Sequence, residues 1–279
     1  MAKFSQHDID EESRLEKEYE KRGIFAYFDI VFNKFVALMN VNFFYLLFSL
    51  PYILFLFWLS PINAGSLAKM STVAAQILGD FTAKEAMMTD LVLRFIFVMG
   101  IIVLWGSGPA SAGIAYILRN YSRREHAWVW ADFIYAIRQN FGQSILVMVI
   151  DILVMFLSAT ALNFYSQMFS GTILTYIYVA FAFILCLYTF MHFYVYQFMV
   201  TYKDSIRQIY RNSFVFAIIK WLPNLLLLAG NAGVILALFY FMQLFALVPF
   251  VIMLTILMAL TIHFYSARSI ARYVEKLKK

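Results

Sequence analysis

Charged residues are scarce in this chain of 279 residues, and that scarcity limits its class. Only 14% of the residues are Asp, Glu, Lys or Arg, whereas 63% are apolar. A soluble domain carries about 25% charged and about 45–50% apolar residues, so no water-facing globule could cover this composition. Cysteine is nearly absent: the lone Cys186 lies in an apolar run and can form no intrachain disulfide. With one cysteine and four scattered histidines there is no metal-ligand spacing, and we expect neither a metal nor another cofactor.

Basic residues are missing from most of the chain. Of the 22 Lys and Arg residues, 19 lie in four segments: six before residue 35, four in 119–138, four in 203–220 and five in 268–279. These segments alternate with apolar runs, and basic loops are retained on the cytoplasmic side of a membrane. The pattern predicts a multi-pass protein of the bacterial cytoplasmic (inner, plasma) membrane with both termini in the cytoplasm. The formal net charge of +6 then predicts contact with anionic lipid headgroups rather than with nucleic acid.

The long apolar runs predict the fold class, which is all-α: a polytopic transmembrane helical bundle with amphipathic cytoplasmic helices. A hydrocarbon layer about 30 Å thick requires about 20 apolar residues in a helix. The runs that meet this requirement predict six spans, at about 36–59, 91–118, 144–164, 172–199, 222–242 and 246–266. Residues 1–24 predict a charged cytoplasmic helix without the apolar core of a signal peptide, and residues 25–279 predict a single membrane domain. The segment 60–90 is the longest on the outer side, and we expect it to form a helix or a helical hairpin.

Two cytoplasmic segments have the periodicity of amphipathic helices. In 128–141 the apolar stripe includes Trp130, Phe133 and Ile137, and in 204–217 a similar stripe includes Ile206 and Tyr210. Both segments lead directly into the next predicted span. They either lie flat in the headgroup region or dock a soluble partner, and these five residues are the candidates for docking.

Asp151 is the most conspicuous ionisable residue in the predicted spans, about nine residues into the third. A charge at mid-bilayer costs at least about 2.5–3.5 kcal/mol, so this residue requires a reason. It is either a functional site for a proton, a cation or a sugar hydroxyl, or a hydrogen-bonded residue that holds helices together. The candidates for an intramembrane polar site are Asp151, Asn40, Asn42, His192 and Asn231, and spacing does not choose among the partners.

Small residues recur every three or four positions from Gly106 to Gly113, with Pro109 among them. Close approach of helices is the usual meaning of such a series. Pro109 adds a kink, and the sharper alternative is a broken helix that lines a substrate cavity, as in many transporters.

Five strings in a fixed order resemble the YesL-like family of bacterial integral membrane proteins, a family of unknown function. They are NFFYLLFSLP from Asn42, GPASAGIAYILRN from Gly108, WVWADFIYAIRQNFGQS from Trp128, YVYQFMVTYKDSIRQIYRNSFVFAI from Tyr194, and KWLP from Lys220. The resemblance covers roughly residues 35–270. It implies a multi-span helical bundle and an association with carbohydrate uptake systems, and it implies no catalytic residues. The stretch 52–107 departs from the family pattern as an insertion.

Three hypotheses about function follow. The first is an integral membrane protein that is an accessory or partner of a carbohydrate uptake system and binds importer subunits. The second is a transporter or permease subunit in its own right, although the ATPase-docking signature of sugar permeases is missing from the cytoplasmic loops. The third is a structural or signalling subunit that docks a cytoplasmic partner. An enzyme is not expected, because no catalytic cluster of His, Asp or Glu is present near either predicted interface.

Overall fold

A computed structural model describes residues 25–59, 83–202, 204–241 and 247–276. The charged segment 1–24 and the predicted outer hairpin up to residue 82 lie outside these residues. The described residues form nine helices and no strand, which confirms the all-α prediction: α2 (Phe25–Asn33), α3 (Phe35–Leu59), α5 (Ala83–Leu104), α6 (Pro109–Ser122), α7 (Val129–Met168), α8 (Gly171–Thr201), α9 (Ile206–Ile219), α10 (Trp221–Phe241) and α11 (Leu247–Lys276).

Several of these helices are long and apolar enough to cross a bilayer. Four qualify by themselves in the described part of the chain: α3, α7, α8 and most of α11. Two further helix pairs qualify only when each is counted as one broken span. One pair is α5 with α6, bent by 61°, and the other is α9 with α10, bent by 87°. The fold is therefore that of a multi-pass membrane protein with four to six candidate spans.

Two helices differ from the predicted layout. The amphipathic segment 128–141 and the third predicted span form one continuous helix, α7, of 40 residues. The predicted span 91–118 is instead divided between α5 and α6, because Gly106 and Gly108 adopt positive φ angles of 95° and 68°. Glycine reaches this left-handed region without steric cost, and a helix cannot continue through it.

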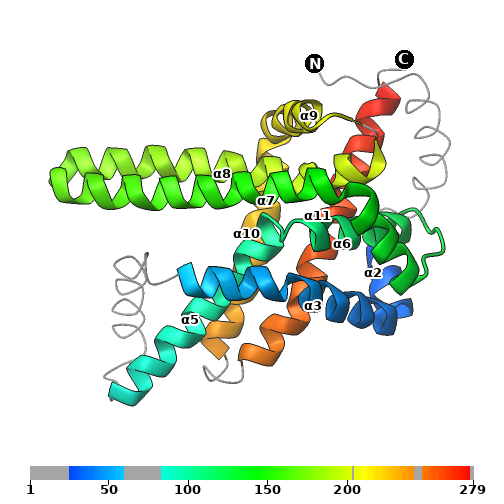
Figure 1. Ribbon diagram of the computed structural model, residues 1–279, viewed down its shortest axis with the longest axis horizontal. Coiled ribbons are helices and arrows are strands. Elements are labelled where there is room, and N and C mark those ends of the chain that lie inside the picture. Colours follow the sequence, from blue (N-terminus) through cyan, green and yellow to red (C-terminus); the bar gives the residue numbers. More distant parts are fainter. Residues whose placement is uncertain (1–24, 60–82, 203, 242–246, 277–279) are drawn as a thin grey trace.

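Helix α6 lies at the centre of the molecule and packs against α3, α7, α8 and α11 (Figure 1). Eleven of its 14 residues are buried. Its small side chains allow neighbouring helices to approach closely, and at Gly113 the ring of Phe133 from α7 occupies the space that a Cβ atom would need. The small-residue series of the sequence therefore marks the helix around which the others assemble.

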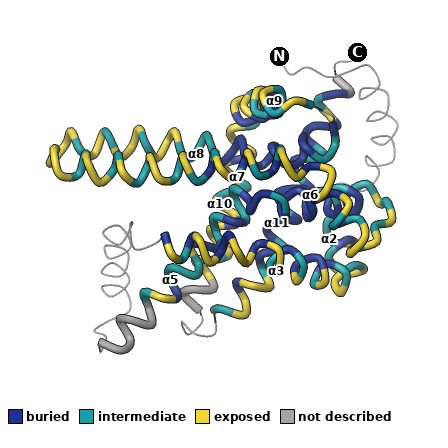
Figure 2. The backbone as a smooth tube through the Cα atoms, viewed as in Figure 1, coloured by how far each residue is buried: buried dark blue, intermediate teal, exposed yellow. Residues whose placement is uncertain are grey.

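Helices α7 and α8 form an antiparallel hairpin that projects from the rest of the molecule (Figure 1). No residue of 152–168 or 171–188 is buried, and Figure 2 shows this outer part in exposed and intermediate colours along its length. The buried residues of α8 begin at Thr189 and those of α7 end at Asp151. These two positions mark the root of the hairpin, where it enters the core.

Candidate functional site

Asp151 lies at the root of the hairpin, on the inward face of α7. The buried residues Asn140, Ser144, Val147 and Asp151 recur at intervals of four, three and four residues, which places them on one side of a helix. Asp151 has no exposed surface. The helix periodicity therefore turns the one acidic residue of this predicted span toward protein rather than lipid.

Two side chains of α8 reach the carboxylate of Asp151. The hydroxyl of Tyr188 donates a hydrogen bond of 2.6 Å to Oδ1. His192 Nε2 lies 2.9 Å from the same oxygen, which is an ion-pair distance, although the ring is not aligned for a hydrogen bond. Tyr188 and His192 are four residues apart, so they share one face of α8. The side chains of both Asp151 and His192 are completely buried.

The other nitrogen of His192 reaches the break between α5 and α6. His192 Nδ1 lies 3.0 Å from the main-chain carbonyl oxygen of Trp105. A carbonyl oxygen only accepts hydrogen bonds, so Nδ1 is the donor and carries a proton. The indole of Trp105 stacks on the imidazole with 6.1 Å between ring centroids and donates from Nε1 to Thr189 Oγ1 at 2.9 Å. The end of α5 thus holds the histidine ring in place from two directions.

The helix break has its own hydrogen bonds, which replace those that a continuous helix would make. The main-chain N–H of Ser107 donates to Ser111 Oγ at 2.7 Å, and that of Gly108 donates to the hydroxyl of Tyr196 at 3.2 Å. Ser49 of α3 adds a 2.6 Å hydrogen bond between its hydroxyl and that of Ser107. Side chains from α3, α6 and α8 therefore satisfy the break, and it is a built feature of the fold.

Several buried polar atoms around Asp151 have no hydrogen-bond partner. They include Asp151 Oδ2, His192 Nε2 and the hydroxyl of Tyr52. Tyr52, Tyr188, Tyr196 and Tyr210 all interact electrostatically with Asp151. A buried polar group without a partner costs about 1–3 kcal/mol, so a group of them around one carboxylate is typical of a functional site rather than of a packed core.

The structure joins only two of the five residues predicted for an intramembrane polar site, Asp151 and His192. Asn42 is buried, but its Nδ2 donates at 2.8 Å to the carbonyl of Ile252 in α11. Asn231 donates to Leu227 O in its own helix at 2.8 Å, and Asn40 is exposed. These three asparagines make no contact with the Asp151 pair in the described structure. Asn42 instead links two helices, and Asn231 bonds within its own turn.

The residues predicted to dock a partner occupy three kinds of position. Phe133 has no exposed surface and Ile137 is 9% exposed, so both belong to the core of the protein. Ile206 and Tyr210 are half-buried. Trp130 is 55% exposed, although one side of its indole lies against Phe44 of α3. Of the five candidates, Trp130 alone presents a large exposed surface.

Sequence reasoning missed Tyr188 and Trp105. Tyr188 belongs to an aromatic run that is typical of a membrane-interface belt, and Trp105 follows an apolar helix. The available signal was the four-residue spacing of Tyr188 and His192 in one predicted span. That spacing puts a hydroxyl and an imidazole on one helix face. It indicates a polar site only when a neighbouring helix places a carboxylate opposite that face.

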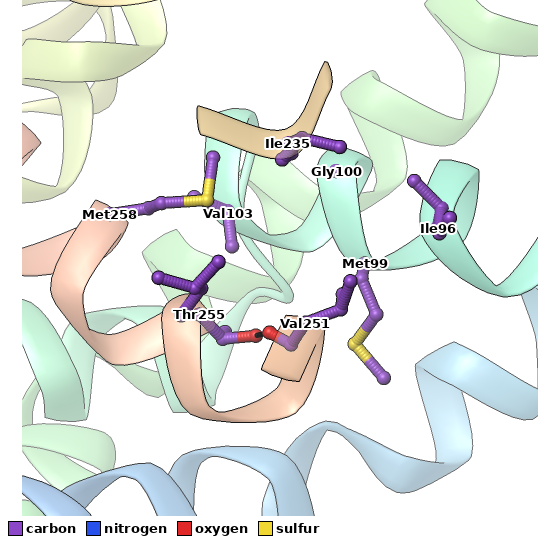
Figure 3. Close-up of a pocket in the computed structure, with 9 residues that line it drawn as sticks. Ile96, Met99, Gly100, Val103, Ile235, Val251, Thr255 and Met258 are labelled. Carbon is purple, nitrogen blue, oxygen red and sulfur yellow. Dashed lines mark hydrogen bonds between the residues drawn. The ribbon is translucent and has the colours of Figure 1, made fainter. Parts of the chain in front are cut away.

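An apolar cavity lies elsewhere, between α5, α10 and α11 (Figure 3). Its lining is apolar apart from Thr255, whose hydroxyl donates to Val251 O in its own helix at 2.9 Å. The lining residues are Ile96, Met99, Gly100, Val103, Ile235, Val251, Leu254, Thr255 and Met258. Without an ionisable or free polar group, this cavity offers no chemistry comparable with that around Asp151.

Among the described residues, no three His, Cys, Asp or Glu side chains gather in a way that could hold a metal ion. The candidate site is therefore a buried carboxylate–imidazole pair, held by a tyrosine and by the end of a broken helix. No protein-family model, curated protein or solved structure matches this chain.

Proposed function

We propose that this chain works in solute transport across the bacterial plasma membrane, as an accessory or partner of a carbohydrate uptake system, with the Asp151–His192 pair as its functional centre. The observation that carries the proposal is a fully buried carboxylate beside a helix break within an apolar fold. Ionisable groups in such a place are costly, and they mark ion or substrate pathways in membrane proteins. The carbohydrate part of the proposal rests on the resemblance to the YesL-like family.

The broken span also favours a second candidate, a transporter in its own right. In many transporters the substrate or ion site lies where a spanning helix is interrupted, because the free main-chain groups there can bind a ligand. In this chain the break presents the Trp105 carbonyl to His192, and His192 lies against Asp151. This arrangement has the parts of such a site without needing a second protein.

Affinity purification from the native host in a mild detergent separates the two candidates. The tagged chain is expected to recover importer subunits if it is an accessory. If it is instead a transporter, liposomes that contain only the purified chain are expected to take up a sugar without importer subunits. A chain that recovers no importer subunit and moves no sugar in liposomes would refute both.

The role of the site is tested by Asp151→Asn in the native host. This substitution keeps the size of the side chain and removes its charge, so loss of growth on the transported carbohydrate is expected at normal protein abundance. Thr255→Val is the matched control, since Thr255 is 1% exposed and its hydroxyl bonds only to its own helix. Equal growth of wild type and Asp151→Asn on every carbohydrate that requires the chain would return Asp151 to a packing role.

A further inference from the structure

We infer that the Asp151–His192 pair binds one exchangeable proton, which makes a proton the specific ligand of this buried site. The inference deepens the proposed function, on which it rests only for the use that transport would make of the proton. It follows from the direction in which each atom of the pair faces.

The first step is the assignment of the imidazole. His192 Nδ1 faces a main-chain carbonyl at 3.0 Å and therefore carries hydrogen. In a neutral ring the other nitrogen, Nε2, is then a hydrogen-bond acceptor. It lies 2.9 Å from Asp151 Oδ1, which is also an acceptor when the carboxyl group is ionised. Two acceptors at this distance repel unless one of them holds a proton.

The second step is the charge of the pair. With the proton on the carboxyl group, both side chains are neutral. With the proton on Nε2, a carboxylate faces an imidazolium. The net charge is zero in both cases, and removal of the proton leaves a single negative charge that has no exposed surface. Burying an unpaired charge is far more costly than burying a neutral pair, so the site holds its proton until the structure around it changes.

The third step concerns what else faces Asp151. The groups that interact with it are the imidazole of His192 and the hydroxyls of four tyrosines: Tyr52 from α3, Tyr188 and Tyr196 from α8, and Tyr210 from α9. A hard cation such as Ca²⁺ requires six or more oxygen ligands. Here one carboxylate oxygen is already shared by Tyr188 and His192, and the described residues supply no second acidic ligand.

The fourth step is access. Asp151 Oδ2 and Tyr52 Oη are buried without partners, and each of them can hydrogen-bond to a water molecule that brings a proton to the pair or takes one away. Loading breaks one O–H bond of a hydronium ion and forms one O–H or N–H bond at the pair, which leaves water. Release reverses both bonds, so no further reactant is needed.

Spectroscopy on the full chain in lipid nanodiscs tests the inference. At neutral pH the wild type is expected to show either a protonated-carboxyl band in the infrared or a doubly protonated histidine in ¹⁵N NMR. Asp151→Asn is expected to remove whichever signal is present. His263→Gln is the matched control, because His263 is the other buried histidine of the described apolar helices and does not contact Asp151.

Two results would overturn the inference. One is a wild type in which neither the carboxyl group nor His192 is protonated at neutral pH. The other is a rise in melting temperature on adding Na⁺ or Ca²⁺ that Asp151→Asn abolishes, which would make the ligand a metal cation. If Asp151→Asn does not fold, His192→Gln must abolish the histidine signal or shift the carboxyl band. An unchanged spectrum in that variant counts against the pair.

These measurements need neither a sugar nor a partner protein, so their outcome is independent of the transport assays. A protonated pair in a chain that fails those assays would leave the proton site in place and refute the transport role. A chain that transports a sugar but shows no protonated pair would support the transport role and refute the proton site.

Discussion

Gly113 is a residue of α6 against which a side chain of α7 packs closely. A Cβ atom at this position would lie 2.7 Å from the ring of Phe133, and that ring has no exposed surface into which it can move. Gly113→Ala is therefore expected to destabilise the fold by about 1–3 kcal/mol, the usual range for overpacking. The measurement is thermal unfolding of the purified protein in detergent.

Gly142 provides the control for this prediction. It lies within α7, where a Cβ atom would meet nothing within 4 Å. Alanine favours helix over glycine by about 1 kcal/mol, so Gly142→Ala is expected to leave the melting temperature unchanged or to raise it. A Gly113→Ala variant as stable as Gly142→Ala would show that α6 and α7 are not packed as described.

The polar pair shows how far single residues can be interpreted without a structure. Asp151 and His192 stand out in the sequence because ionisable groups are rare and costly in apolar helices. Their pairing does not follow from the sequence, because it requires the relative rotation of α7 and α8. Asn42 and Asn231 are likewise polar residues in apolar helices, but they donate hydrogen bonds elsewhere, Asn42 to Ile252 O and Asn231 to Leu227 O. Residue type predicts that a polar partner is needed, and packing alone decides which one.

At the level of elements, the break between α5 and α6 depends on Gly106. Its φ angle is 95°, and a Cβ atom would collide with the ring of Tyr196. Gly106→Ala therefore combines backbone strain of about 1–3 kcal/mol with a clash against a side chain of the site. We expect a lower melting temperature and loss of the His192 signal that depends on the Trp105 carbonyl, as measured by thermal unfolding and ¹⁵N NMR.

Gly100→Ala is the control within α5, the helix that ends just before the break, since a Cβ atom there would meet nothing within 4 Å. Its effect is expected to stay within about 1 kcal/mol, the difference in helix propensity between the two residues. If both variants behave alike, the break does not position the histidine.

The elements were predictable to different degrees. Long apolar runs predicted α3, α8 and α10 to within two residues at each end. A run of about twenty apolar residues has few stable structures other than a membrane-spanning helix. The break at residues 105–108 was one of two alternatives, since Pro109 is tolerated in the first turn of a new helix as well as in a kink. The merging of residues 129–168 into one helix was not visible, because an amphipathic stretch and an apolar span have the same period.

For the molecule as a whole, the distribution of basic residues predicts which side each loop faces. Ser170 lies at the tip of the hairpin, and Ser205 precedes α9; both are exposed. In a background with Cys186→Ala, a membrane-impermeant maleimide is expected to label Ser170→Cys in intact cells. It is expected to label Ser205→Cys only after the cells are opened.

The reverse labelling pattern would contradict the predicted orientation, and labelling of both sites in intact cells would contradict the crossing of the membrane by α8. Native Cys186 is half-buried and is removed so that each protein carries a single thiol.

The hairpin of α7 and α8 is anchored at one end only. Its outer part extends for about 25 Å along α7 from Asp151, at 1.5 Å per residue, and no residue of that part is buried. Asp151 and His192 lie at its anchored end, whereas Trp105 directly follows α5 in the body of the protein. A small tilt of such a long arm therefore becomes a change in the spacing between the imidazole and the carbonyl that holds it. We expect the thickness and lateral pressure of the surrounding lipid to act on this arm and thereby to alter the geometry at its root.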